Sequence, residues 1–152
     1  MDGEAAVLIL EAPLGSDLYR QALVLREQIL RKPLGLTMSQ EELADDAIRR
    51  HFCAVELGAV IGMVSLRPLD EETLHLKQLA VSQDKRDSHV GTRLLAHAEA
   101  WGANAGFRLM IAHARIGAEG FYFKRGYAQE GEPFEEHTIP HVRVTKQLSQ
   151  EA

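Results

Sequence analysis

The 152-residue sequence contains one cysteine, Cys53, so no disulfide can form within the chain. A chain without disulfides is typical of the reducing cytoplasm, and we expect a cytoplasmic protein. The sequence also lacks any run close to the roughly 20 apolar residues that span a bilayer. No signal-peptide pattern opens it. We therefore expect no membrane partner.

Positive charge is also scarce. The formal net charge is −5 at pH 7, and the absence of a basic tail or stripe argues against a nucleic-acid partner. Any anionic ligand must be held by a local cluster of donors. The seven histidines form no HExxH pattern and have no paired cysteines beside them, so we expect no metal site.

What the chain does contain is the pattern of a single domain over residues 1–152, without repeats or linkers. Hairpins come first and a strand–helix–strand unit follows, which predicts an α/β (α+β) fold around one sheet. The expected strands are Val7–Leu10, His51–Leu57, Val60–Leu66, Leu74–Val81, Leu109–Ala114, Gly126–Glu130 and Val142–Gln147.

Local signals indicate where the helices begin and end. Asp17 is expected to cap the first helix, and Pro33 and Gly35 to end it. Ser39 and Glu42 resemble a capping box for a second, shorter helix. Two further helices are expected at Val90–Trp101 and Ala118–Lys124.

The stretch SQDKRDSHVG, residues 82–91, is a polar turn between an expected strand and an expected helix. A helix N-terminus carries unpaired N–H donors and roughly half a positive charge, which suits it to phosphate. Gly91 permits close approach of the backbone, while Lys85 and Arg86 add positive charge. The alternative is a solvated turn in which Asp87 or Ser88 only caps the helix.

Other stretches fall in a recognisable order: LKQLAV (Leu76–Val81), then the turn at Arg86–Gly91, then FYFKRGY (Phe121–Tyr127). Together they resemble the GNAT superfamily of coenzyme A-dependent N-acyltransferases, in which a LAV-like strand end precedes an Arg/Gln-x-x-Gly-x-Gly/Ala loop and an FYxxxGF element follows. The segment GEPFEEHTIPHVRVTK (Gly131–Lys146) is similar to the small bacterial ElaA-like branch. The resemblance extends over about residues 18–147.

This resemblance implies a single domain with a mixed, mostly antiparallel twisted sheet of six to seven strands and about four helices. It also implies acetyl-CoA as the cofactor, a small-molecule or peptide amine as the acceptor, and direct attack of that amine on the thioester. The residues expected to contact the cofactor are Leu79, Ala80, Val81, Arg86, Asp87, Ser88, His89, Val90, Gly91, Thr92, Arg115, Ala118, Phe121, Tyr122 and Lys124.

The sequence departs from the family pattern at three of these positions. His89 stands where the loop usually has its first glycine, so the backbone there carries a side chain. Asp87 places a carboxylate beside the expected pyrophosphate. Arg115 replaces the family's usual asparagine and is expected to meet either the cofactor or the substrate.

Acyl transfer to an amine requires a neutral amine, a donor for the developing oxyanion and a proton for the leaving thiolate. By resemblance, the backbone N–H of Leu79 faces the thioester carbonyl and Tyr122 lies near the sulfur. A phenol with a pKa of about 10 is a weaker acid than a thiol at about 8.5. We therefore expect Tyr122 to hydrogen-bond to the sulfur as charge develops, and a core tyrosine is the alternative.

The base that deprotonates the amine is expected to be His75 or His141, because imidazole titrates near neutrality without help. His113 and His97 are expected to be structural. Other groups near the end of the chain that border the expected acceptor site are Glu135, Glu136 and His137.

The residues leave two further classes open. One is an acyl-CoA-binding regulatory domain of the same fold with little or no turnover. The other is a phosphate-binding protein of another fold, which is disfavoured because the chain has neither a Walker lysine motif nor a dinucleotide glycine fingerprint. The acceptor amine and the oligomeric state, a homodimer included, are left open by the sequence.

Overall fold

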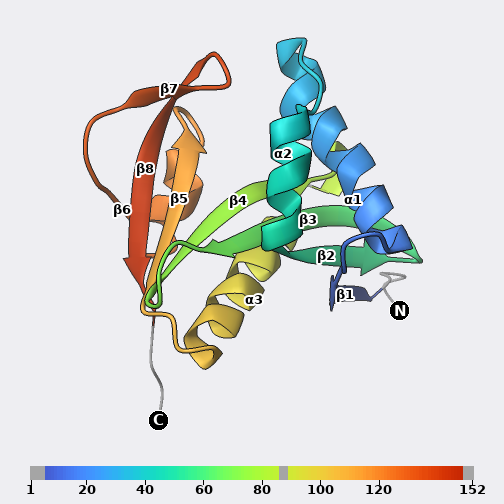
Figure 1. The fold of residues 1–152 in the computed structure, drawn as a ribbon, viewed down its shortest axis with the longest axis horizontal. Helices are drawn as coiled ribbons and strands as arrows, with labels where there is room; N and C mark the ends of the chain where they lie inside the picture. Colours follow the sequence, from blue (N-terminus) through green and yellow to red (C-terminus); the bar gives the residue numbers. More distant parts are fainter. Residues whose placement is uncertain (1–5, 86–88, 149–152) are drawn as a thin grey trace. The chain divides into compact units, whose positions relative to one another are not determined.

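The structure is a computed structural model that describes residues 6–85 and 89–148 (Figure 1). Its strands are β1 (Val7–Glu11), β2 (Arg50–Glu56), β3 (Ala59–Pro68), β4 (Thr73–Val81), β5 (Leu109–Arg115), β6 (Ala128–Gln129), β7 (Phe134–Glu136) and β8 (Ile139–Gln147). Its α-helices are α1 (Asp17–Arg26), α2 (Gln40–Asp45), α3 (Val90–Asn104) and α4 (Glu119–Phe123).

The strand order is β1-β2-β3-β4-β5-β8-β6, with β7 beside β8. The pair β4–β5 is parallel, and the pairs β1–β2, β2–β3, β5–β8, β6–β8 and β7–β8 are antiparallel. The predicted α/β fold class with a mixed, mostly antiparallel sheet is therefore confirmed. Within the described residues the sheet has eight strands, whereas six to seven were expected. The additional strand is β7, which the sequence did not predict.

By its internal contacts the chain divides into two compact units. The first comprises Met1–Arg67 with Gln78–Ala98, and the second comprises Pro68–Lys77 with Glu99–Ala152. The strand β4 and the helix α3 each have residues in both units.

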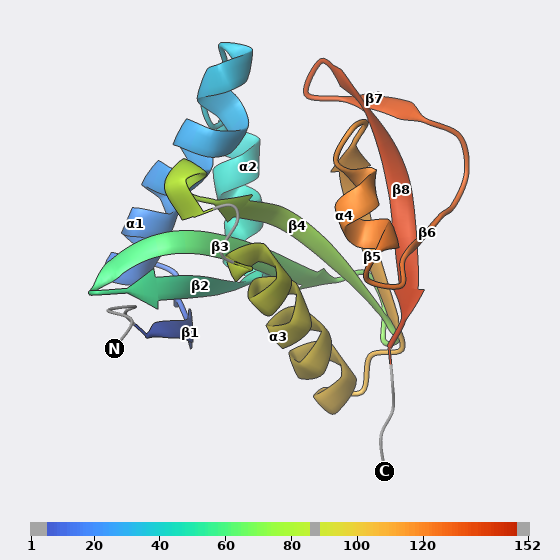
Figure 2. The same ribbon diagram turned by 180° about the vertical axis from the view of Figure 1, so that it is seen from behind.

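In the first unit, the hairpin β2–β3 is buried on both faces. Phe52 contacts His97 of α3, and a Cβ at Gly62 would meet Val90 and Leu94 of the same helix. The neighbouring Cys53 and Met63 belong to a core on the other face with Tyr19, Ala22, Val55 and Ala80. Figures 1 and 2 show α1 and α2 on one side of this hairpin and α3 on the other. Burial on both faces explains why these strands read as continuous apolar runs.

The turn of that hairpin consists of Leu57 and Gly58, whose φ angles are 53° and 79°. Two consecutive positive φ angles are the geometry of a type I′ turn, which matches the twist of the flanking strands. The sequence predicted the turn at Gly58, and the exposed Leu57 takes the same left-handed conformation without being a glycine.

The first helix begins one residue earlier than predicted. Ser16, not Asp17, is the N-cap, since its hydroxyl accepts a hydrogen bond from the N–H of Tyr19 at 3.2 Å. Asp17 is the first helical residue and pairs with Arg20. Ser and Asp are equally good N-caps, so either residue predicts a helix that begins here. Only the backbone path decides which of the two is the cap.

The helix continues as a π-helical turn (Glu27–Arg31) and a 3₁₀ turn (Lys32–Leu34), and the chain then reverses at Gly35, whose φ is 73°. The predicted capping box of α2 is confirmed. The hydroxyl of Ser39 accepts from the N–H of Glu42 at 3.0 Å, and the Glu42 carboxylate accepts from the N–H of Ser39 at 3.1 Å. A further 3₁₀ turn (Asp46–Ile48) follows α2.

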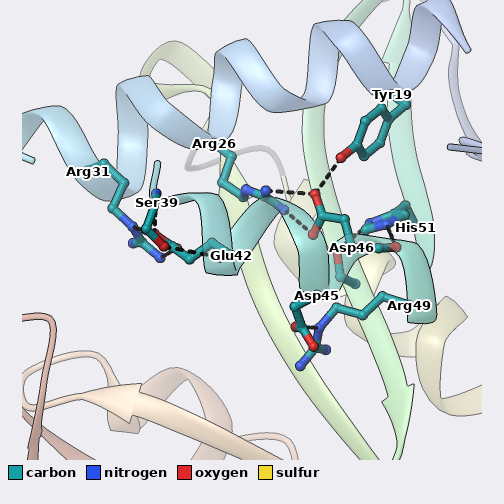
Figure 3. Close-up of polar contacts among 10 residues, drawn as sticks. Tyr19, Arg26, Arg31, Ser39, Glu42, Asp45, Asp46, Arg49 and His51 are labelled. Carbon is teal, nitrogen blue, oxygen red and sulfur yellow. Dashed lines mark hydrogen bonds and ion pairs between the residues drawn. The ribbon is translucent and has the colours of Figure 1, made fainter. Parts of the chain in front are cut away.

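A buried polar network joins α1 to the turn after α2 (Figure 3). Arg26 donates to both carboxylate oxygens of Asp46, at 3.1 and 2.8 Å, and both side chains are fully buried. The hydroxyl of Tyr19 donates to the same carboxylate at 2.5 Å. His51 donates from Nε2 to the carbonyl of Asp46 and accepts at Nδ1 from Ser65. Burial lowers the pKa of His51, so it remains neutral in this network.

Candidate functional site

The parallel strands β4 and β5 are paired over four residues each, from Thr73–Leu109 to Leu76–Ala112. The register ends there among the described residues, whereas β5 keeps its antiparallel partner β8 as far as Arg115. The carboxyl end of a parallel strand pair is where α/β sheets commonly bind ligands, because side chains and backbone groups are not used up in pairing there. The stretch predicted to form the acyl site, Leu76–Val81, begins at the last residue of β4 that pairs with β5.

Two residues past the last pair, Gln78 has a φ of 61°, a left-handed conformation that is rare for residues other than glycine. Such a residue interrupts the extended backbone and turns the following groups to new directions. Leu79 and Val81 are half-buried, while Ala80 packs its side chain into the core of the first unit. Of these three predicted contacts, Ala80 therefore has only its backbone to offer a ligand.

The turn before α3 contains the predicted phosphate-binding residues. Arg86, Asp87 and Ser88 lie outside the described residues. Lys85 forms an ion pair with Glu56, with 2.7 Å between Nζ and Oε1. The hydrogen bond and the charge of Glu56 raise the pKa of Lys85, so its ammonium stays protonated and paired with Glu56.

His89 is exposed and has a φ of 65°. The backbone thus keeps a glycine-like conformation although it carries an imidazole there. The carbonyl of His89 accepts the first intrahelical hydrogen bond of α3, from the N–H of Arg93 at 3.0 Å. The side chain at position 89 is therefore compatible with the left-handed backbone that directly precedes α3.

The helix α3 begins at Val90 and is 15 residues long. Val90 is a core residue and 1% exposed, whereas Gly91 and Thr92 are half-buried on the first turn. The N–H groups at the start of any α-helix have no acceptors within the helix, so this end offers donors to an anion.

Tyr122 lies on α4 in the second unit and is 8% exposed. Its ring packs edge-to-face against Phe121 and Tyr127, with centroids 5.2 and 5.5 Å away. Burial raises the pKa of Tyr122 above its ordinary value, so the phenol keeps its proton at neutral pH. Tyr127 in turn donates to Glu99 at 2.9 Å, and Lys146 donates to the other oxygen of Glu99 at 3.0 Å.

The other predicted contacts of the second unit are arranged around α4 and at the end of β5. Ala118 is exposed at the start of α4, and Lys124 is exposed after its end. Phe121 is half-buried, and Arg125 lies over its ring at 4.1 Å. Arg115 is the cross-strand partner of His141 and thus shares a face of the sheet with it.

The predicted bases His75 and His141 are both buried, at 9% and 4% exposure. They belong to one group of side chains on a single face of β4, β5, β7 and β8, which we call the histidine face. It consists of His75, His113, Phe134, Glu136 and His141. The ring of His75 lies 4.8 Å from that of His113, and Phe134 stacks on His141 at 6.0 Å.

Within the histidine face, Nδ1 of His113 lies 2.9 Å from Oε1 of Glu136. The hydrogen bond from His113 is the main cause that lowers the pKa of Glu136 to about 2, and the charges of His113, His141 and Lys77 act in the same direction. From the sequence, His113 was expected to be structural, and its pairing with Glu136 was not predicted. Only the antiparallel β7–β8 hairpin brings Glu136 to His113, and no local sequence signal carries that information.

A family model described as "Acetyltransferase (GNAT) family" matches residues 17–127 of the chain. The chain belongs to the GNAT acetyltransferase family. The predicted family is therefore confirmed.

This GNAT protein has a curated relative in the uncharacterized N-acetyltransferase YitI of Bacillus subtilis. The two are 31% identical over 84 residues, which cover 51% of this chain and 56% of YitI. A GNAT family acetyltransferase from Elizabethkingia anophelis, solved with acetyl-CoA bound, is similar with a TM-score of 0.73 and 20% identity over 93% of this chain and 98% of that one. Escherichia coli ElaA is similar with a TM-score of 0.77 and 17% identity over 93% and 99%.

Within residues 6–85 and 89–148, no three His, Cys, Asp or Glu side chains are grouped so that they could hold a metal ion. Across the same described ranges, every helix falls short of the length and apolarity that a bilayer crossing requires.

Proposed function

We propose that this protein is an acetyl-CoA-dependent N-acetyltransferase that acetylates a primary amine of a small molecule or a peptide. The observation that carries the proposal is the end of the β4–β5 register at Leu76–Ala112, followed by the left-handed Gln78. This interruption falls in the LKQLAV stretch that resembles the acyl site of the family. Acetyl-CoA supplies an acetyl thioester that reacts with an amine.

The cofactor is assigned to the start of α3. The backbone N–H groups near Gly91 and Thr92 are the donors proposed for the pyrophosphate, and Arg86 adds charge. The left-handed φ of 65° at His89 supports this assignment, because the family glycine at that position is needed for its backbone conformation. The remaining contacts proposed for the pantetheine and its neighbourhood are Leu79, Ala80, Val81, Asp87, Ser88, Val90, Arg115, Ala118, Phe121 and Lys124.

Two groups are assigned to the chemistry of the thioester. The backbone N–H of Leu79 is proposed to donate to the carbonyl oxygen as it gains charge. The hydroxyl of Tyr122 is proposed to donate to the sulfur as the thiolate forms. Its burial favours the protonated phenol, which supports hydrogen-bond donation over full proton transfer.

The acceptor arrives as an ammonium ion at neutral pH, since an alkyl amine has a pKa of about 10.4. It therefore has to lose a proton before it can attack. We assign this task to the histidine face, to which the expected bases His75 and His141 belong. A histidine base makes the rate rise between about pH 6 and 8 as imidazole becomes neutral.

The proposal is tested with purified protein, acetyl-CoA and a panel of primary amines that includes polyamines, amino sugars and lysine peptides. We expect at least one amine to accelerate the release of free thiol, with formation of its acetamide. Tight binding of acetyl-CoA without thiol release from any acceptor would instead support the regulatory alternative.

The cofactor site is tested with Gly91→Asp, which places a carboxylate where the pyrophosphate is proposed to bind. Because an acidic residue near a helix N-terminus favours the helix, the variant should stay folded. We expect calorimetry to detect no acetyl-CoA binding. The control Ala96→Asp adds the same charge at an exposed position further along α3 and should bind normally. Unchanged affinity in Gly91→Asp would remove the pyrophosphate from this helix.

A further inference from the structure

The histidine face contains one imidazole that differs from its neighbours in access to solvent. The side chain of His113 is 26% exposed and that of Glu136 is 23% exposed, whereas His75 and His141 are 9% and 4% exposed as whole residues. A base that receives a proton from an incoming amine has to be reached by that amine or by its water. Accessibility therefore favours His113 over the two histidines that the sequence predicted.

The position of His113 in the sheet is also favourable. It follows Ala112, the last residue of β5 that pairs with β4. His113 thus stands at the carboxyl end of the parallel strand pair, where open α/β sheets bind their ligands. His75 lies on β4 beside it, with ring centroids 4.8 Å apart.

Glu136 orients this imidazole. A carboxylate only accepts hydrogen bonds, so Nδ1 of His113 carries the hydrogen and donates it to Oε1 of Glu136 at 2.9 Å. In the neutral ring the lone pair is then on Nε2. A carboxylate on the far nitrogen fixes the tautomer and stabilises the imidazolium after it gains a proton, as in other carboxylate–histidine pairs.

The hairpin that carries Glu136 holds a strained turn. His137 and Thr138 connect β7 to β8 with φ angles of 51° and 67°, although neither is a glycine. Positive φ at such residues is unfavourable and persists only where the surroundings enforce it. The hairpin thereby places Phe134 edge-on against His113, with ring centroids 4.9 Å apart, and Glu136 at its Nδ1.

We propose that His113 takes the proton from the acceptor amine and that Glu136 is the positioning residue that holds its imidazole for this task. The proposal rests on the proposed function, because it names the base of that reaction. One N–H bond of the acceptor ammonium breaks, and the proton forms a new N–H bond at Nε2 of His113. The amine lone pair then forms the C–N bond while the C–S bond breaks and its electron pair leaves with sulfur. Of the two protons that the nitrogen loses, one ends on sulfur and one passes through His113 to water.

Other titratable and charged groups lie near His113 or Glu136 on the surrounding elements, and they contribute to the pH profile. On β4 and β5 these are His75, Lys77 and Arg115; on the β7–β8 hairpin they are Glu136, His137, His141 and Arg143. Arg143 is the cross-strand partner of His113, and its Nε lies 2.9 Å from Oε1 of Glu130. Because these groups also affect a pH profile of the rate, the first test follows the NMR signal of the His113 ring itself.

The first experiment needs no substrate. Proton–carbon NMR follows the histidine ring signals of the full-length protein against pH, and the signal lost in His113→Asn identifies His113. In Glu136→Gln, which is nearly isosteric, we expect the midpoint of that signal to move to lower pH because the imidazolium loses its anionic partner. Glu132→Gln, at an exposed position before the hairpin, should leave it in place. An unmoved midpoint in Glu136→Gln would overturn the pair.

The second experiment uses the amine found with the panel. We expect His113→Asn to lower kcat by about 10²- to 10⁴-fold and to abolish its rise with pH. Glu136→Gln retains the base and should move the rise to lower pH with a smaller loss of kcat. The control is His97→Asn, which replaces a histidine that packs on Phe52. This variant should keep both the kcat of the unaltered protein and its rise with pH.

The outcomes separate the two proposals. If the unaltered protein transfers acetyl to no amine, the proposed function is rejected. If it is active and His113→Asn retains its rate and pH profile, only the assignment of His113 is overturned, and His75 and His141 are tested next. Should His113→Asn not fold, the pH profile of Glu136→Gln decides.

Discussion

Tyr122 is a phenol that burial keeps protonated, with a pKa raised above its ordinary value. Proton transfer from it to a thiolate is therefore more unfavourable than for a phenol in water, while hydrogen-bond donation costs nothing in ionisation. This residue is expected to help the leaving group only as negative charge develops on sulfur.

We predict that Tyr122→Phe lowers kcat by about tenfold and leaves the affinity for acetyl-CoA nearly unchanged, since the lost interaction strengthens only in the transition state. Single-turnover kinetics measures this without interference from product release. Tyr127→Phe, which loses a hydrogen bond to Glu99, is the matched control and should affect stability more than rate. A loss of several hundredfold in Tyr122→Phe would make it a full general acid, and no loss would make it a core residue.

At the scale of elements, α1 is held to the turn after α2 by the pair Arg26–Asp46 (Figure 3). Two charges that are both fully buried lose their hydration, and their attraction and hydrogen bonds have to offset that loss. The hydroxyl of Tyr19 donates a further hydrogen bond to the Asp46 carboxylate, while His51 donates to the backbone carbonyl of the same residue.

We predict that Asp46→Asn lowers the free energy of unfolding by about 3–5 kcal/mol, because the guanidinium of Arg26 remains buried without a counter-charge. Urea unfolding followed by circular dichroism measures the change. Asp17→Asn removes the exposed partner of Arg20 on the same helix and should cost less than about 1 kcal/mol. Equal losses of unfolding free energy in the two variants would contradict the prediction, because breaking the buried pair would then cost no more than breaking the exposed one.

At the scale of the whole molecule, all three tyrosines have raised pKa values: Tyr19, Tyr122 and Tyr127. Burial is the largest cause in each case, and the carboxylates of Asp46 and Glu99 add to it for Tyr19 and Tyr127. Because the folded-state pKa lies above the unfolded value of about 10, folding favours the neutral phenols. Their contribution to stability is complete below pH 10 and is lost as pH rises beyond it.

We predict that an alkaline titration shows no phenolate absorbance step near pH 10 in the folded protein. Phenolate should appear only at higher pH, together with the loss of the circular dichroism signal. Because the tyrosines lie in both compact units, the same titration reports on each. Ionisation of all three near pH 10 with unchanged circular dichroism would contradict the burial of their hydroxyl groups.

Much of the fold follows from local sequence. The capping box of Ser39 and Glu42, the chain reversal at Gly35 and the turn at Gly58 each depend on residues close together in the chain, so their backbone conformations can be predicted. The order of the motifs likewise predicted the family. The choice of Ser16 over Asp17 as cap shows the limit of such signals, since neighbouring residues with equal propensity are separated only by the backbone path.

The long-range pairs were decided by tertiary structure alone. Arg26 and Asp46 are 20 residues apart, and His113 and Glu136 are 23 apart. Arg26 meets Asp46 because α1 packs against the turn after α2. His113 meets Glu136 through strand register and the β7–β8 hairpin, where a shift of one residue would turn each side chain to the opposite face. The sequence by itself determined the family, the order of elements and a set of candidate histidines. Only the register of β5 with β8 and the β7–β8 hairpin selected His113, because burial and hydrogen bonding are properties of the packed sheet.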